Sequence, residues 1–104
     1  MSLNDQQRAA TREELRSNLA LSGQSVADAA AALGRSSARM QAALDVTDAQ
    51  PEDVWLLRDY LNRVILANDL TPRPYSALAE HMRAAAEKWF PLADVEDIIK
   101  RAAR

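Results

Sequence analysis

The residues whose types and spacing suggest a chemistry lie between positions 25 and 44, in the stretch SVADAAAALGRSSARMQAAL. This pattern predicts two short helices joined by a tight turn at Gly34 and Arg35, which is the spacing of a DNA-binding helix-turn-helix. Gly34 can adopt a positive φ, so that the chain turns sharply, and Ser36 offers a hydroxyl to cap the second helix. The chemistry indicated is recognition of double-stranded DNA.

The predicted second helix of this unit, 37–45, would be the one that enters the major groove. Gln41 could pair with an adenine edge and Arg39 with a guanine or a phosphate, while small neighbouring side chains would let the backbone approach closely. Arg35 departs from the pattern, because an apolar, buried residue usually follows the turn glycine in such units. The predicted DNA contacts are Arg35, Ser36, Ser37, Ala38, Arg39, Gln41 and Ala42.

A further group of basic residues lies on the helix that is expected first in the chain. Arg8, Arg12 and Arg16 repeat every four residues and therefore share one face. One interpretation is a row of phosphate contacts beside the groove. The alternative is a solvated face held by ion pairs, because Asp5–Arg8 and Glu13–Arg16 are both suitably spaced.

The distribution of charge matters more than its sum. The formal net charge is −2 over 104 residues, which is unfavourable for a protein that binds nucleic acid. Residues 1–44 hold five arginines against four acidic residues, whereas residues 45–70 hold two arginines against six acidic residues. The acidic residues are therefore concentrated in the middle of the chain, and the helix-turn-helix part is weakly basic.

Several other classes of protein are disfavoured. The chain has no cysteine, which excludes disulfides and thiolate metal sites, and no apolar segment approaches the roughly 20 residues needed to span a bilayer. His81 is the only histidine, no acid or serine is placed to pair with it, and the motifs GxSxG and HExxH are absent. We expect a cytoplasmic protein that is not an enzyme, does not enter a membrane and holds no metal or cofactor.

Helices account for the whole expected fold, since no run with period-two alternation predicts a strand. A capping box at Asn4 begins a helix that ends near residue 20, and further helices are expected at 26–33, 37–45, 51–68, 75–90 and from residue 95 onward. This predicts an all-α fold of five to six helices, a lambda-repressor-like helix-turn-helix bundle with a C-terminal helical extension. The single domain, 1–104, would divide into a helix-turn-helix part, 1–45, and a part that supplies the core and a dimerisation surface, 51–104.

The helix predicted over 51–68 has a strongly apolar face and a second, mixed face. Trp55, Asp59, Asn62 and Leu66 share the mixed face, and we predict that they form the interface of a homodimer. The alternative is that the C-terminal helices of the same chain cover Trp55, since large apolar patches rarely stay exposed. The last helix would either pack back on the core or exchange with a second subunit. The inner face of the helix predicted over 75–90 would consist of Leu78, Met82, Ala85 and Trp89.

Five stretches of the chain resemble a small bacterial family of uncharacterised proteins: MSLN, TREEL, LSGQSVADAAAALGRSS, PEDVWLLRDYL and KWF. The resemblance covers about residues 1 to 90, and PEDVWLLRDYL is its most specific part. It implies a helical protein with a lambda-repressor-like or Cro-like helix-turn-helix, and it implies no activity. WLLRDYL would be a structural signature, centred on a buried Trp55 and an Arg58–Asp59 pair.

Three hypotheses about function follow. The first is a small DNA-binding transcriptional regulator, a homodimer whose two recognition helices lie about one DNA turn apart. The second is a non-catalytic helical protein-interaction module in which the helix-turn-helix is only scaffold, which the net acidity and Arg35 favour. The third is a sensor that binds a small molecule near Trp55, Tyr60 and Trp89.

Overall fold

Local capping signals determine where the N-terminal helices of the protein begin and end. In the computed structural model, which describes residues 3–103, the Asn4 carboxamide accepts from the Gln7 backbone at 2.7 Å and the Gln7 side chain accepts from the Asn4 N–H at 3.0 Å. Ser25 and an aspartate three residues on form a second capping box. Gly34 ends the next helix with a φ of 63°, the left-handed conformation that only glycine adopts at little cost.

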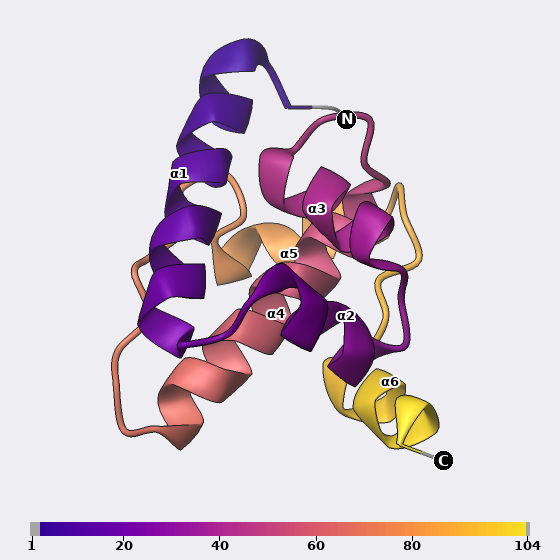
Figure 1. The fold of residues 1–104 in the computed structure, drawn as a ribbon. Coiled ribbons are helices and arrows are strands. Elements are labelled where there is room, and N and C mark those ends of the chain that lie inside the picture. Colours follow the sequence, from indigo (N-terminus) through magenta and orange to yellow (C-terminus); the bar gives the residue numbers. More distant parts are fainter. Residues whose placement is uncertain (1–2, 104) are drawn as a thin grey trace.

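The described residues form helices and no strand, so the prediction of an all-α fold is confirmed (Figure 1). Most of the predicted boundaries are reproduced within one or two residues. The helices are α1 (Asp5–Ser22), α2 (Val26–Leu33), α3 (Ser37–Asp45), α4 (Pro51–Ala67), the 3-10 helix η1 (Glu80–Met82), α5 (Arg83–Glu87) and α6 (Val95–Ala102). None of these helices is both long enough and apolar enough to cross a membrane.

The central element is α4, against which α1, α3 and α6 pack (Figure 1). Small residues allow the short helices to approach closely, because Ala29, Ala30 and Ala43 are all buried where α2 and α3 meet their neighbours. Larger side chains fill the space between α1, α3 and α4, among them Leu15, Met40 and Leu61 of the core. The α2–turn–α3 unit is thus held on a helical support.

The prediction of a continuous helix over 75–90 is wrong. Only η1 and α5 are helical there, and of the expected inner face Leu78 is buried while Ala85 and Trp89 are exposed, Trp89 by 67%. In a continuous α-helix the Leu78 carbonyl would accept from the N–H of Met82. Instead the Nε of Arg58 donates to that carbonyl at 2.9 Å, and the N–H of Met82 donates to Ala79 at 2.9 Å. A tertiary hydrogen bond has replaced a helical one.

The C-terminal helix α6 packs back on its own chain, beside α2 and α4 (Figure 1). Asp94 caps it, its Ile98 is buried, and Arg63 of α4 forms an ion pair of 2.5 Å with Glu96. The end of α6 closes on the turn between α2 and α3. A Cβ atom placed on Gly34 would lie 3.2 Å from the Cβ of Ala102.

The two left-handed glycines therefore predict different costs for the same substitution. Gly23 has a φ of 72°, and a Cβ atom placed on it would have no neighbour within 4 Å. Gly23→Ala should lower the free energy of unfolding by about 1–2 kcal/mol, the cost of the left-handed backbone alone. Gly34→Ala should cost more, because the added methyl also crowds Ala102. Urea unfolding measures both values.

The double variant Gly34→Ala/Ala102→Gly is the control, because it removes the crowding but keeps the backbone strain. The free energy of unfolding lost in the double variant, minus the loss in Ala102→Gly alone, should equal the loss in Gly23→Ala. Equal losses for the single variants Gly34→Ala and Gly23→Ala would show that α6 does not press on the turn.

Candidate functional site

The outward face of α3 carries the residues that the sequence predicts to contact DNA. Ser36, Ser37, Ala38 and Gln41 are exposed, and Ala42 is half-buried. On the opposite side, the core residues of α3 are Met40, Ala43 and Leu44. Ser36 caps the helix by accepting from the N–H of Arg39 at 3.1 Å. The first turn of α3 therefore offers small, uncharged side chains to any partner.

The structure gives Arg39 a different role from the predicted base contact. Its guanidinium makes two hydrogen bonds to Asp53 of α4, at 2.9 Å from Nε and 2.7 Å from Nη2. Asp53 is buried, and the paired hydrogen bonds raise the pKa of Arg39. Since buried carboxylates require such partners, Arg39 fixes α3 on α4 rather than reaching for a base.

Arg35, which follows the turn glycine, is half-buried. Its Nη1 donates to the carbonyl of Leu33 at 3.2 Å, and its Nε is buried with no hydrogen-bond partner within residues 3–103. The side chain thus folds back over the turn, at the position where an apolar residue is usual.

Two of the three arginines on α1 bind the C-terminal end of α3. Arg12 donates to the carbonyl of Asp45 and Arg16 to its carboxylate, each at 2.8 Å. Gln41 donates to the same carboxylate at 3.1 Å, and these hydrogen bonds, that of Arg16 foremost, lower the pKa of Asp45. Cations are stabilised at this end of a helix because its free carbonyl groups make it negative.

The row of phosphate contacts predicted on α1 is therefore already engaged within the chain. Arg8 pairs with Asp5, as the alternative interpretation expected. Arg16, however, pairs with Asp45 of α3 instead of the expected Glu13. The reason is geometric, since α1 passes the end of α3 and a helix C-terminus adds its own attraction to that of the carboxylate.

Most of the predicted dimer face on α4 is covered by the chain itself. Trp55 is only 4% exposed, and the guanidinium carbons of Arg58 and Arg83 lie 5.2 Å and 5.0 Å from the centre of its ring. Asn62 is half-buried, and only Leu66 is well exposed, at 60%. The alternative, in which the C-terminal part of the chain covers Trp55, describes this face correctly.

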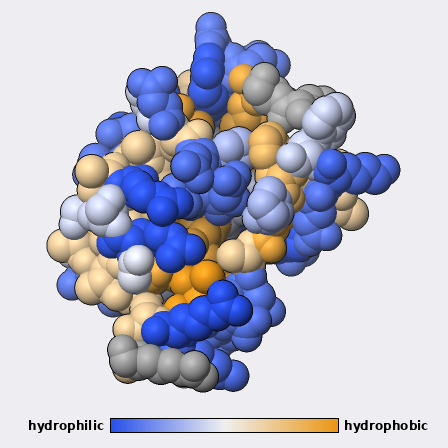
Figure 2. Space-filling model, turned by 90° about the vertical axis from the view of Figure 1, so that its right-hand side faces the viewer, coloured by the Kyte–Doolittle hydropathy of each residue, from blue (hydrophilic) through white to orange (hydrophobic). Residues whose placement is uncertain are grey.

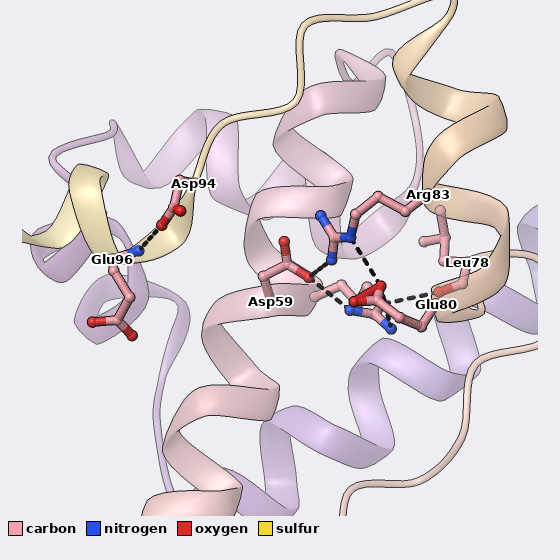
Figure 3. Close-up of polar contacts among 7 residues, drawn as sticks. Asp59, Leu78, Glu80, Arg83, Asp94 and Glu96 are labelled. Carbon is pink, nitrogen blue, oxygen red and sulfur yellow. Dashed lines mark hydrogen bonds and ion pairs between the residues drawn. The ribbon is translucent and has the colours of Figure 1, made fainter.

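Four charged residues, which we call the arginine cluster, connect α4 to η1 and α5: Arg58, Asp59, Glu80 and Arg83 (Figure 3). Asp59 accepts from Arg58 at 2.6 Å and from Arg83 at 2.7 Å, and the hydrogen bond from Arg83 raises the pKa of that arginine. Glu80 pairs with Arg83 at 2.9 Å. The motif WLLRDYL contains Trp55, Arg58 and Asp59, but no pattern in the sequence indicated Arg83 as their partner.

A pocket of about 450 Å³ borders Trp55, and we call it the apolar pocket. Its walls come from the N-terminal half of α1, the α3–α4 loop with the start of α4, and residues 76–90. Figure 2 shows hydrophobic side chains recessed between hydrophilic ones on one face of the molecule. The lining residues used below are Leu3, Gln7, Arg8, Asp48, Trp55, Ser76, Ala85 and Trp89. Tyr60 is not among the lining residues, since it packs elsewhere in the core and donates to Gln24 at 2.8 Å.

These features describe a helical chain with a small exposed face at the start of α3 and an irregular segment that the arginine cluster joins to α4. The chain belongs to DUF2316, a family of uncharacterized proteins conserved in bacteria, whose model matches residues 1–91. The expected likeness to an uncharacterised bacterial family is thereby confirmed, while the lambda-repressor-like relationship stays a prediction. No curated protein and no solved structure matches the chain. Helix α6 lies beyond the matched residues.

The arginine cluster predicts a large stability effect at Asp59. Asp59→Ala leaves the buried guanidinium of Arg58 without its carboxylate and should lower the free energy of unfolding by about 3–5 kcal/mol. Glu80→Ala is the matched control, because Glu80 is 69% exposed and its loss should cost about 1 kcal/mol or less. Urea unfolding compares the two, and similar losses would contradict the central place of Asp59.

The contacts of Asp45 predict an acid dependence of stability. Because the folded-state pKa of Asp45 is lowered, this carboxylate contributes stability above its ordinary pKa, and the contribution is lost as the pH falls through the folded-state value. Asp45→Asn should therefore make the decline of the free energy of unfolding below about pH 4 shallower. Arg16→Gln should have the same effect, since it removes the main partner. If the free energy of unfolding declines at low pH equally in both variants and in the unaltered protein, Asp45 does not make this contribution.

Proposed function

We propose that this protein is a small DNA-binding regulator that presents the first turn of α3 to the major groove. The observation that carries the proposal is the exposed face of Ser36, Ser37, Ala38 and Gln41, which directly follows the left-handed turn at Gly34. Helices α1 and α4 hold α3 from its other side and from its C-terminal end. The recognition surface is thus supported by rigid elements.

The roles of the predicted DNA contacts change within this proposal. Arg39, Arg12 and Arg16 become positioning residues, because they fix α3 to α4 and α1. The proposed base contacts are Ser37, Ala38 and Gln41. The exposed carboxamide of Gln41 can give up its hydrogen bond to Asp45 and pair with an adenine edge instead.

The phosphate contacts in this proposal come from two places. The free N–H groups at the start of α3, around Ser36, suit a phosphate oxygen. Additional positive charge comes from Lys100 and Arg101, which are exposed at the end of α6, the end that reaches Gly34. We also propose that a homodimer places two such surfaces about one DNA turn apart.

The test is fluorescence anisotropy with mixed-sequence duplex DNA, titrated over salt concentration. Binding should weaken with a log–log slope of about −0.9 for each phosphate contacted. Ala38→Glu places a negative charge on the exposed face of α3 and should abolish binding. Ala67→Glu adds the same charge to the exposed end of α4 and should leave the affinity almost unchanged.

A second candidate, the protein-interaction module, is favoured by one specific observation. The guanidinium groups of Arg39 and Arg16 already bind acids of the same chain, and the net charge is −2. If the protein shows no DNA binding even at roughly 50 mM salt, where phosphate contacts are strong, the regulator proposal fails and this candidate replaces it.

A further inference from the structure

We propose that the apolar pocket binds a small, uncharged, largely apolar ring compound. This binding function is independent of DNA recognition. The pocket and the exposed face of α3 are different surfaces, since none of Ser36, Ser37, Ala38 and Gln41 lines the pocket.

The shape of the pocket suits a small molecule. Its volume, about 450 Å³, falls within the roughly 300–1,000 Å³ typical of ligand sites. Three segments far apart in the sequence line it, so that it is a partly open hollow rather than a flat patch. Its two tryptophans differ in exposure, because Trp55 is buried whereas Trp89 is 67% exposed. An aromatic side chain exposed at the rim gains most from a ring that covers it.

The chemistry of the lining favours an uncharged, largely apolar ligand over a charged or strongly polar one. Three of its polar side chains already have partners inside the protein: Gln7 in the capping box, Arg8 with Asp5, and Ser76 with Glu14. A polar ligand would have to break these contacts or leave its own groups unpaired, which is costly. Asp48 is an exposed residue, so solvent can reach its carboxylate. What remains for a ligand is apolar contact area.

The pocket also has a wall that a ligand can stabilise. Residues 76–90 contact the rest of the chain through the buried Leu78, through the partly buried Met82 and Ala86, and through polar contacts such as that of Arg83 with Asp59 at 2.7 Å. A bound ring would add apolar contacts between this wall, Leu3 of the N-terminal side and Trp55 of α4. Binding to the folded state alone must raise its thermal stability.

The experiment uses N-phenyl-1-naphthylamine, an uncharged aromatic fluorophore whose emission rises in apolar surroundings. Titrated with the full chain in the absence of DNA, its fluorescence should saturate at one molecule per chain and the midpoint of thermal unfolding should rise. Trp89→Ala removes an exposed side chain, so the fold should survive, and it should weaken binding by about tenfold or more. Ala85→Phe, which fills the pocket from an exposed position on α5, should weaken it as well.

The matched control is Leu66→Ala, which removes an apolar side chain that is 60% exposed and does not line the pocket. It should leave the affinity for the fluorophore unchanged. Equal binding by all variants, or binding without saturation at one molecule, would overturn the proposal. The proposal would also be overturned if light scattering showed that the protein self-associates and that Trp89→Ala abolishes this self-association. Trp89 would then join two copies of the chain rather than cover a ligand. The fluorophore outcomes do not bear on the DNA titration, whereas self-association through Trp89 would identify the surface of the proposed homodimer.

Discussion

The C-terminal half of the structure depends on one constraint, the burial of the Arg58 guanidinium. Its side chain is only 9% exposed, and a buried charge is tolerated only when it is paired and hydrogen-bonded. Asp59 supplies the opposite charge, the Leu78 carbonyl accepts from Nε, and the rings of Trp55 and Tyr75 lie within 5.3 Å of the guanidinium carbon. Burial in this setting also raises the pKa of Tyr75 to about 12.

The irregular path of residues 76–82 follows from that constraint. The Leu78 carbonyl, to which Met82 would donate in a continuous α-helix, accepts from Arg58 instead, and the chain makes only a 3-10 turn before α5. Glu14 of α1 accepts from both the N–H and the hydroxyl of Ser76, which ties the start of this segment to α1. Polar contacts made outside the apolar pocket therefore help to hold its wall in place.

The limits of prediction from the sequence have the same origin. Helices α1 to α4 and α6 could be predicted because capping residues, glycine turns and apolar periodicity are local signals. Residues 76–79 include alanines and a leucine, which favour helix, yet this part of the predicted helix is irregular and carries the tertiary hydrogen bonds of Ser76 and Leu78. For the candidate site, periodicity correctly predicted which side of α3 is exposed. It could not predict that Arg12 would meet Asp45, 33 positions away, because no pattern within the sequence specifies that pair.

The pairing of charges also changes the meaning of the acidic middle of the chain. Residues 45–70 hold six acidic residues against two arginines, which suggests a surface that repels nucleic acid. Three of those acids, Asp45, Asp53 and Asp59, bind arginines that come from outside the segment. Several of these acidic side chains therefore join helices to one another. The net charge of the segment consequently describes the electrostatic potential at the protein surface poorly.

The contact between α6 and the turn at Gly34 has an evolutionary consequence. Residue 34 must satisfy two demands, a left-handed backbone and a lack of space beside Ala102, and the second comes from a helix outside the family-matched residues. A chain that lost or displaced α6 would keep only the first demand, which asparagine can also meet. The substitutions tolerated at position 34 should therefore depend on the tail that a given chain carries, so that the same mutation has different fitness effects in different backgrounds.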